Sequence, residues 1–589
     1  MIPRPITLTS CRKTFTADQD KARRPEETLA SFYNQINKLP IKIVSEVRRI
    51  DNGRLGIPVY FSVCGDDAQA LTGTKKQMGK GASPAQAEAS ACMELAERFS
   101  LFSFRHQPGN FLVGDYESLS DYPLLPAEEL LKSVGEQHLD GGQLRQILAG
   151  IPLRWAWATE LVSGRAVLVP FSWFFAINEF NGSSAGNTLE EAALQAICEV
   201  IERHVSSLVS RGRLAAPMIE AQSLTDPVAR ELLRKFAGAG VDLRLYDFSL
   251  DTGVATVAAV GMDAATFPTA SEIVYTAGTS PDPQKAAIRA ITEVAQLAGD
   301  FNTGANYVAS GLPKPASLAE LAYLGGQPES IDALPNLADD DILVEIQRLV
   351  AALEAIGLSV FLIDATDPRL AIPAVYAIVP GAHFRERASQ GEAGLFAAKL
   401  AVDLLDDDAI LEQKLTAMED LLPENAYLPF YRGQRAMEAG DPERAVGHFN
   451  QALTVSAEEE EIASEVATIC SYAGSCLNGL GRYQEAIDML TRGLEADEER
   501  PDIHNSLGVA CYKLERYEEA IRHFGRAVEL NPASAIDYAN LGVNHARLGR
   551  HEEARNFLRL ALTLDASLDF ARRELAILED EALVNRDTL

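Results

Sequence analysis

A 34-residue period runs through the last part of the chain and limits its fold more than any other feature. Small and large apolar residues recur at this spacing in three successive units, at Gly474, Gly508 and Gly542, at Ala486, Ala520 and Ala554, and at Leu490, Phe524 and Leu558. An earlier unit carries Gly433, Ala445, Phe449 and Ala452, and a 41-residue step separates it from the next one. An acidic insert at residues 458–461 explains the longer step. A period of this length predicts stacked units that bury a shared core, with small residues where neighbouring helices cross.

The clearest unit also fits the consensus of a known repeat. It carries Leu507, Gly508, Tyr512, Ala520, Phe524, Ala527 and Pro532. This pattern resembles the tetratricopeptide repeat, a helix–turn–helix unit, and predicts three to four units over residues 424–580. The resemblance implies an all-α solenoid that binds a peptide or a partner protein. A packing or dimerising role is the alternative, so the sequence leaves a homodimer open.

The length and composition restrict the kind of protein further. A chain of 589 residues is expected to hold several domains, and its formal net charge of −31 argues against nucleic acid or an anionic membrane surface as a partner. The seven cysteines form no CxxC pair, which disfavours a zinc or iron–sulfur framework. Residues 1–7 lack a signal-peptide pattern, and no run of about 18 apolar residues occurs. We therefore expect a cytoplasmic protein without a membrane partner.

The part of the chain before the repeats mixes strand and helix patterns. Paired β-branched and aromatic segments at residues 154–161 and 165–169, and again at 241–249 and 254–262, read as strands that alternate with long helices. This mixture predicts an α+β (mixed α/β) domain over residues 1–395. Residues 396–423 form an acidic linker or helix, and the repeats follow.

Three helices of this first domain repeat one polar stripe. Their expected N-caps are Ser83, Thr188 and Asp282, and alanines fill matching positions in all three. The stripe positions lie three or four residues apart on one helix face: Ser90, Glu94, Glu97 and Arg98 in the first helix, Gln195, Glu199, Glu202 and Arg203 in the second, and Arg289, Glu293 and Gln296 in the third. The register is the same each time, which favours one shared site.

The chemistry of the stripe points to a metal and a polyphosphate. Carboxylates on facing buried helices repel each other unless a cation lies between them, and Mg²⁺ prefers such oxygen ligands. Arg98, Arg203, Arg289 and Lys80 offer donors for phosphate oxygens. The alternative is that each stripe is a solvated helix face with i, i+4 ion pairs. For two residues a purely structural role is the alternative. Glu191 can act as a capping-box residue, and Lys80 can hold the loop before Ser83.

Three long motifs resemble those of the YcaO family. Gly79-Lys80-Gly81, followed by Ser90, Glu94, Glu97 and Arg98, is similar to the first motif. Ser184-Ala185-Gly186-Asn187, followed by Glu191, Gln195, Glu199, Glu202 and Arg203, is similar to the second, and Arg289, Glu293 and Gln296 are similar to the third. The resemblance covers about residues 10–390.

The resemblance implies an ATP-dependent enzyme that activates a peptide backbone amide. A nucleophile adds to the carbonyl, ATP phosphorylates the amide oxygen, and loss of phosphate leaves an azoline, a thioamide or an amidine. The implied Mg²⁺ ligands are Glu94, Glu97, Glu199, Glu202 and Glu293. The implied nucleotide contacts are Ser184, Glu191, Arg203 and Arg289, assisted by Ser90 and Gln195, with Lys21 and Thr28 as further candidates. From their places in or beside the motifs, we also expect Lys80, Arg98, Asn187 and Gln296 to contact the nucleotide. Glu199, Glu202 and Arg203 are the residues expected to act in catalysis.

One difference from part of the family narrows the range of products that we expect. Azoline-forming members typically end in a proline-rich tail, whereas the printed sequence ends in Val584-Asn585-Arg586-Asp587-Thr588-Leu589. We therefore expect thioamidation, or assistance of sulfur modification of a translation protein, with a sulfur-delivery or TfuA-like protein as partner. The alternatives are an azoline-forming cyclodehydratase and a non-catalytic ATP-binding scaffold. Cys92 and Cys198 lie inside the motif helices, where we expect them to pack like alanine.

Overall fold

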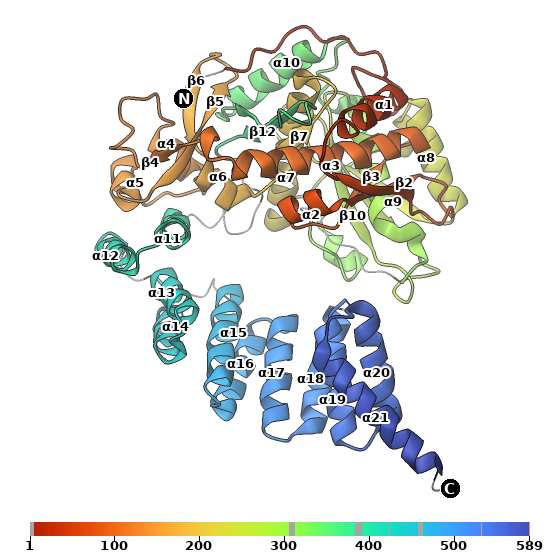
Figure 1. Ribbon diagram of the computed structural model, residues 1–589. Coiled ribbons are helices and arrows are strands. Elements are labelled where there is room, and N and C mark those ends of the chain that lie inside the picture. Colours follow the sequence, from red (N-terminus) through yellow and green to blue (C-terminus); the bar gives the residue numbers. More distant parts are fainter. Residues whose placement is uncertain are drawn as a thin grey trace. The chain divides into compact units, whose positions relative to one another are not determined.

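The chain forms two units, which are described separately. A computed structural model describes residues 5–304, 312–382, 384, 392–422, 425–456, 463–531 and 533–587. The first unit spans Met1–Leu400 and the second Ala401–Leu589 (Figure 1). The predictions that rest on Pro532, on residues 458–461 and on the last two residues lie outside the described residues.

In the residues that the structure describes, the first unit holds three antiparallel sheets (Figure 1). The first has the order β1 (Val44–Arg49), β2 (Val59–Cys64), β3 (Lys76–Lys80), and the second the order β10 (Val274–Thr279), β9 (Thr256–Met262), β8 (Asp242–Asp247). The third has the order β4 (Leu112–Gly114), β5 (Leu153–Glu160), β11 (Phe361–Asp364), β12 (Ala374–Ile378), β7 (Ser183–Ala185), and β6 (Ala166–Pro170) pairs with β5. Together with the helices between them, these sheets confirm the predicted mixed α/β fold.

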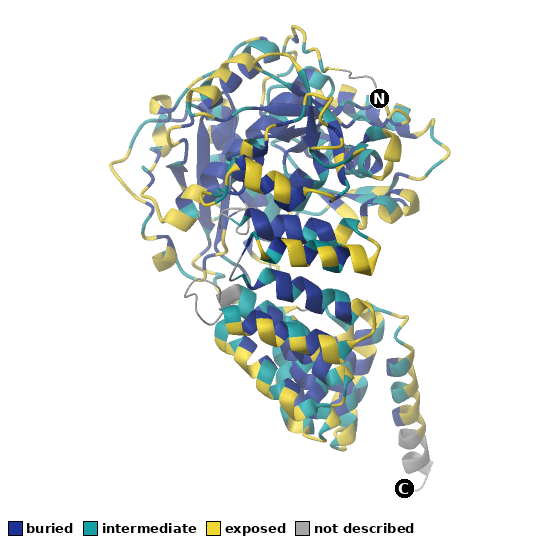
Figure 2. Cartoon of the chain, turned by 90° about the vertical axis from the view of Figure 1, so that its left-hand side faces the viewer, coloured by how far each residue is buried: buried dark blue, intermediate teal, exposed yellow. Residues whose placement is uncertain are grey.

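Further helices of the first unit are α1 (Pro25–Ile36), α2 (Asp66–Thr72), α4 (Ala127–Ser133), α5 (Gly141–Leu148), α6 (Phe171–Asn178), α8 (Pro227–Gly238) and α10 (Ile342–Ala355). Helices α2, α6 and α8 pack against strands β2, β5 and β8, and α4 packs against α5. Strands β9, β10 and β12 are buried along almost their whole length. Much of the interior of the first unit is accordingly dark blue in Figure 2. Such nearly continuous burial is typical of strands whose two faces are both covered.

Each of the three motif helices follows a strand in the same way. Strand β3 leads into α3 (Pro84–His106), β7 into α7 (Leu189–Gly212) and β10 into α9 (Pro283–Ala298), each time across three connecting residues. The side chains of Ser83, Thr188 and Asp282 accept backbone N–H groups of the first helical turn, as the sequence predicted. The repeated stripe is therefore carried by a repeated strand–helix element.

Close approach of strand and helix explains the small residues in these elements. A Cβ atom on Gly79 would lie 2.0 Å from the backbone nitrogen of Ala91, and one on Gly278 would lie 2.5 Å from that of Ala290. Gly79 and Gly278 occupy equivalent positions in the repeated element, as do Ala91 and Ala290. Any side chain at these glycines would push the helix away from its strand.

The second unit is helical. After α11 (Ala393–Leu404), which crosses its boundary, come α12 (Asp408–Glu419) and four helix pairs: α13 (Tyr427–Glu438) with α14 (Pro442–Ser456), α15 (Ala463–Gly479) with α16 (Tyr483–Ala496), α17 (Pro501–Lys513) with α18 (Tyr517–Leu530), and α19 (Ala535–Arg547) with α20 (His551–Leu564). Helix α21 (Asp569–Asp587) follows. Gly508 faces the ring of Phe524, as the predicted crossing of small residues requires. None of the described helices is long and apolar enough to cross a membrane.

Candidate functional site

On α3, the stripe is held by a network around one arginine. Nη1 of Arg98 lies 2.9 Å from Oε1 of Glu97, and Nη2 lies 3.9 Å from Oε1 of Glu94. The hydroxyl of Ser183, from β7, lies 2.7 Å from the same Glu97 oxygen. The first motif helix is thus joined to the strand that precedes the second one.

On α7, the equivalent side chains are joined to the third element. Nη2 of Arg203 lies 3.7 Å from Oε1 of Glu199. The backbone N–H of Thr279, the last residue of β10, donates to Oε2 of Glu202 at 3.1 Å, and Nη2 of Arg289 lies 3.7 Å from that oxygen. The second motif helix is therefore bound by the strand and the helix of the third element.

The third strand–helix element is joined in turn to the first. Lys80, the last residue of β3, forms an ion pair with Glu293 of α9. Ser183 of β7 reaches α3, Thr279 of β10 reaches α7, and Lys80 of β3 reaches α9. A closed ring of contacts therefore joins the three helices, and Lys80 extends into this ring.

The glutamates of the ring are largely buried. Their side chains are between 12% and 33% exposed, Glu202 least and Glu94 most. This burial contradicts the alternative of a solvated helix face, because fully hydrated carboxylates would be much more exposed. The i, i+4 ion pairs of that alternative are present, between Glu94 and Arg98 and between Glu199 and Arg203. Burial, followed by the nearby charges of Glu199 and Glu94, raises the pKa of Glu97 to about 8. Burial also raises the pKa values of Glu94 and Glu199 and lowers that of Lys80 to about 7.

The donors in the ring are suited to a metal and an anion. Buried carboxylates whose pKa values are raised gain from a cation nearby, and carboxylate oxygens are ligands that Mg²⁺ prefers. The Nε atoms of Arg203 and Arg289 are buried without a hydrogen-bond partner, which leaves donors for phosphate oxygens. Within the described ranges, three acidic, histidine or cysteine side chains never converge as a preassembled metal site. Each glutamate is paired with a protein donor instead.

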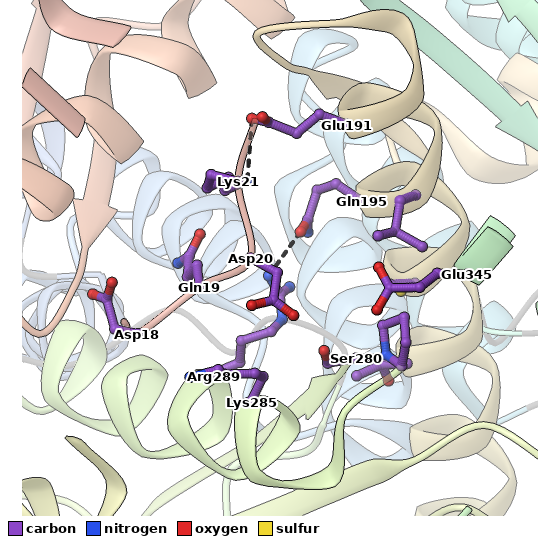
Figure 3. A pocket seen from close by; sticks show the side chains of 14 residues that line it. Asp18, Gln19, Asp20, Lys21, Glu191, Gln195, Ser280, Lys285, Arg289 and Glu345 are labelled. Atoms are coloured by element: carbon purple, nitrogen blue, oxygen red, sulfur yellow. Dashed lines mark hydrogen bonds and ion pairs between the residues drawn. The ribbon is translucent and has the colours of Figure 1, made fainter. Parts of the chain in front are cut away.

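A pocket adjoins the ring at Arg289 (Figure 3). Nη1 of Arg289 donates to Oε1 of Gln195 at 2.8 Å, and both residues line the pocket, as does Lys21. The other lining residues are Asp18, Gln19, Asp20, Glu191, Leu194, Cys198, Thr279, Ser280, Pro281, Lys285 and Glu345. Four of the residues predicted to contact nucleotide, Lys21, Glu191, Gln195 and Arg289, therefore meet in one cavity.

The N-terminal segment is fastened to this pocket through Glu191. The carboxylate of Glu191 accepts the backbone N–H of Ala22 at 3.0 Å and the side-chain amide of Asn187 at 3.1 Å, and Nζ of Lys21 lies 3.5 Å from it. The hydroxyl of Thr28 donates to Oδ1 of Asn187 at 3.0 Å. Glu191 is thus directed at the N-terminal segment, rather than acting only in the cap of α7.

Three predicted residues lie less centrally. Ser184 is buried in β7, with its hydroxyl 3.5 Å from the carbonyl of Ala185. Ser90 and Gln296 are half-buried on α3 and α9. In the parts of the chain that the structure describes, neither forms a hydrogen bond or ion pair with another predicted site residue. Their assignment to the nucleotide remains a prediction.

Sequence reasoning missed part of the pocket. Glu345 on α10 is fully buried, and its Oε1 lies 2.6 Å from Nζ of Lys13, while Oε2 has no partner. Burial raises the pKa of Glu345 to about 7. Lys285 on α9 binds Asp226 at 2.8 Å and the carbonyls of Thr16 and Ala17. A signal existed for Glu345, since it shares the apolar face of α10 with Ile342 and Ile346.

The two cysteines of the motif helices are poor nucleophiles. Cys92 is fully buried and Cys198 is 3% exposed. Burial raises the pKa of each thiol to about 12, so both stay protonated at neutral pH. Their surroundings agree with the packing role expected from the sequence.

Comparison with known families matches both units. The sequence model of the YcaO family, described as "YcaO cyclodehydratase, ATP- and Mg²⁺-binding", matches residues 78–383, which is more than half of the chain. Two tetratricopeptide-repeat models match residues 501–534 and 538–568.

Individual relatives extend this result. An uncharacterized protein of Methanothermobacter thermautotrophicus is 31% identical over 392 residues, which cover 61% of this chain and 94% of the relative. An uncharacterized protein from the 3′ region of tfuA in Rhizobium leguminosarum is 25% identical over 391 residues, which cover 62% of this chain and 88% of that protein. A solved heterocyclase, in complex with substrate and cofactor, aligns with a TM-score of 0.52 and 23% identity. That alignment covers 66% of this chain and 56% of the heterocyclase, and it shows a shared fold.

The ring of charged residues on three equivalent helices, the pocket beside it and these matches lead to one conclusion. The chain belongs to the YcaO family, whose domain binds ATP and Mg²⁺, and it carries tetratricopeptide repeats after that domain.

Proposed function

We propose that this protein uses ATP and Mg²⁺ to activate a peptide backbone amide by phosphorylating its oxygen, and that the product is a thioamide or a related sulfur modification. The observation that carries the proposal is the ring of buried glutamates and basic side chains on α3, α7 and α9, which adjoins the pocket at Arg289. Phosphoryl transfer needs mainly positioning and charge neutralisation, and this donor set is suited to both.

The residues divide into two groups in this proposal. Glu94, Glu97, Glu199, Glu202 and Glu293 hold Mg²⁺, which withdraws charge from the phosphate oxygens when bound. Lys21, Glu191, Gln195, Arg203 and Arg289 bind the nucleotide. Arg203 and Arg289 each direct a basic group with an unpartnered Nε at the phosphates. In this structure the glutamates are paired with protein donors, and they would have to give up those pairs to hold Mg²⁺.

The reaction balances with a sulfide donor. Sulfide adds to the carbonyl carbon, and the resulting oxyanion attacks the γ-phosphorus of ATP with release of ADP. Phosphate then leaves as the C=S bond forms, so amide, hydrosulfide and ATP yield thioamide, ADP and inorganic phosphate. The relative from the tfuA region supports a TfuA-like protein as the sulfur-side partner. An azoline-forming reaction is the alternative product with the same ATP chemistry.

The repeats supply protein binding in this proposal. Arrays of helix pairs present extended surfaces that bind peptides or partner proteins. We assign this array the capture of the substrate protein or of the sulfur-delivery partner. A non-catalytic scaffold that binds ATP and docks other proteins is the second candidate function, and it predicts no phosphate release.

Phosphate release separates the two candidates. The purified protein is incubated with ATP and Mg²⁺, and inorganic phosphate is measured for the wild type, Glu199→Ala and the control Glu231→Ala. Glu231 lies on α8 and pairs with Arg234, with a side chain that is 47% exposed. We expect release by the wild type and the control, and at least a tenfold loss in Glu199→Ala. Equal phosphate release by all three proteins would contradict the proposed enzymatic activity.

A further inference from the structure

The repeated element allows two arginines to be compared at one register position. Arg98 and Arg203 each follow the second glutamate of their stripe, on α3 and α7. Their partners differ, although their side chains are similarly buried, at 13% and 17% exposure. A difference between equivalent residues is informative because the surrounding helix geometry is the same.

Arg98 is held on several sides. Its guanidinium lies 3.9 Å from the centre of the Phe180 ring, within the range of a cation–π interaction. Nη1 also donates to the hydroxyl of Ser183 at 3.2 Å and to the carbonyl of Phe180 at 3.5 Å, in addition to its pair with Glu97. The Ser183 hydroxyl in turn contacts the carboxylate of Glu97 and the Phe180 carbonyl. Arginine, glutamate and the segment before β7 thus form one closed cluster.

Arg203 is held far less. Its pair with Glu199, at 3.7 Å, matches the equivalent pair of Arg98 with Glu94, at 3.9 Å, but no close pair like that of Arg98 with Glu97 is present and its buried Nε has no hydrogen-bond partner. Arg289 likewise has a buried, unpartnered Nε. An unpartnered donor can turn towards a ligand at little cost in free energy, because no hydrogen bond is broken. The donors of Arg98 would first have to leave their partners.

We propose that Arg98 is a positioning residue that Phe180 and Ser183 lock in place, so that it orients Glu97 and Glu94, and that Arg203 is the arginine that meets the phosphates. The inference rests on the proposed function, because it assumes that the ring binds Mg²⁺ and a nucleotide. It removes Arg98 from the phosphate donors that the chemistry of the stripe predicted and gives Phe180 a role that no motif indicated.

Separate titrations of metal and nucleotide test this division. The full-length protein binds a fluorescent β,γ-methylene ATP analogue, with Mg²⁺ varied at saturating analogue and with the analogue varied at saturating Mg²⁺. We expect Phe180→Leu and Arg98→Lys to raise the half-saturating Mg²⁺ concentration, by roughly threefold to tenfold for loss of the ring contact, and to leave analogue affinity at saturating Mg²⁺ within about twofold. We expect Arg203→Lys to weaken analogue binding at saturating Mg²⁺ by about tenfold or more.

Two further variants make the test specific. Phe180→Tyr keeps an aromatic ring and is expected to restore the wild-type Mg²⁺ requirement. Phe175→Leu removes the ring that lies 4.4 Å from Arg105, farther along the same helix, and is expected to change neither titration. Fluorescence of Trp155, Trp157 and Trp173, all in the first unit, checks that each variant is folded.

The outcomes separate this inference from the proposed function. A wild-type Mg²⁺ requirement in Phe180→Leu would overturn the inference, as would a loss of analogue affinity in Arg98→Lys equal to that in Arg203→Lys. In both cases the wild type still binds the Mg²⁺–analogue complex, so the proposed function stands. If the wild type bound no analogue at any Mg²⁺ concentration, the proposed function would fail and the inference with it.

Discussion

Nη2 of Arg289 lies 3.7 Å from Oε2 of Glu202, so a cation from α9 is paired with a carboxylate from α7. Nη1 of the same arginine donates to Gln195 at 2.8 Å inside the pocket. One guanidinium therefore connects the ring of glutamates to the cavity beside it. Residues from different repeats of the strand–helix element meet at this point, and the site depends on all three.

Replacing this arginine is expected to affect nucleotide binding strongly. Arg289→Gln removes the charge beside Glu202 and a donor for phosphate, and hydrogen bonds to charged groups contribute about 1.5–3 kcal/mol each. We predict that the Kd of a non-hydrolysable ATP analogue rises by about tenfold or more, measured by calorimetry at saturating Mg²⁺. Arg234→Gln serves as control, because the Arg234 side chain is 72% exposed on α8. An unchanged Kd in Arg289→Gln would show that this arginine does not bind the nucleotide.

The pH dependence of stability should carry a contribution from Glu345. Burial raises its pKa from 4.5 to about 7, so the folded chain holds a proton on this group between those pH values and the unfolded chain does not. The free energy of unfolding therefore falls as pH rises through this window, by up to about 1.4 kcal/mol per pH unit. The charged groups next to Glu345 are Lys13, which opposes the rise in pKa, and Asp20, which adds to it.

The measurement uses urea unfolding of the wild type and Glu345→Gln, followed by tryptophan fluorescence between pH 5 and 7.5. All three tryptophans lie in the first unit, so the signal reports that unit. Glutamine does not titrate, and we expect the wild type to lose stability relative to the variant as pH rises. Parallel pH profiles for the two proteins would contradict this assignment.

The packing of strand against motif helix predicts a large effect of one methyl group. In Gly278→Ala the new Cβ would lie 2.5 Å from the nitrogen of Ala290, so the helix must shift. We predict a loss of about 1–3 kcal/mol in the free energy of unfolding. Nucleotide binding should also weaken, because the new Cβ would lie 2.7 Å from the Cβ of Arg289 and would displace this residue. In the control Gly109→Ala the new Cβ has no atom within 4 Å. Equal stability of the two variants would show that α9 tolerates a wider spacing from β10.

The structure explains why some elements were predictable and others were not. The N-caps Ser83, Thr188 and Asp282 are local signals, and all three helices begin directly after them. Strand β3 escaped notice because Gly79 and Lys80 read as a loop before the helix. Pairing of Lys80 with Val59 of β2 makes this segment a strand, and that contact lies outside any local pattern.

The same contrast between local signals and long-range contacts applies to the site. The shared register of Glu94, Glu199 and Glu293 indicated one common site, and the structure joins their helices in a ring. Which partner each side chain takes depended on long-range contacts, such as Thr279 with Glu202 and Phe180 with Arg98. The sequence of a helical motif does not indicate which backbone N–H or aromatic ring of a distant segment will contact it. Only the three-dimensional structure could show these contacts.

The division of the chain predicts separable activities. All predicted site residues lie in the first unit, Met1–Leu400. We therefore expect a protein of residues 1–400 to bind the ATP analogue within about threefold of the full-length affinity, while capture of the substrate or sulfur-delivery partner in a pull-down is lost. Partner capture that persists without residues 401–589 would move the docking function to the first unit.

The central claim is that glutamates from three helices hold Mg²⁺ for ATP. Its most direct test is the Mg²⁺ dependence of ATP-analogue binding by the wild type and Glu199→Gln, a variant that keeps the size of the side chain and removes its charge. We predict that Mg²⁺ strengthens binding by the wild type at least tenfold and that Glu199→Gln loses most of this gain. Identical, Mg²⁺-dependent binding by both proteins would contradict the account.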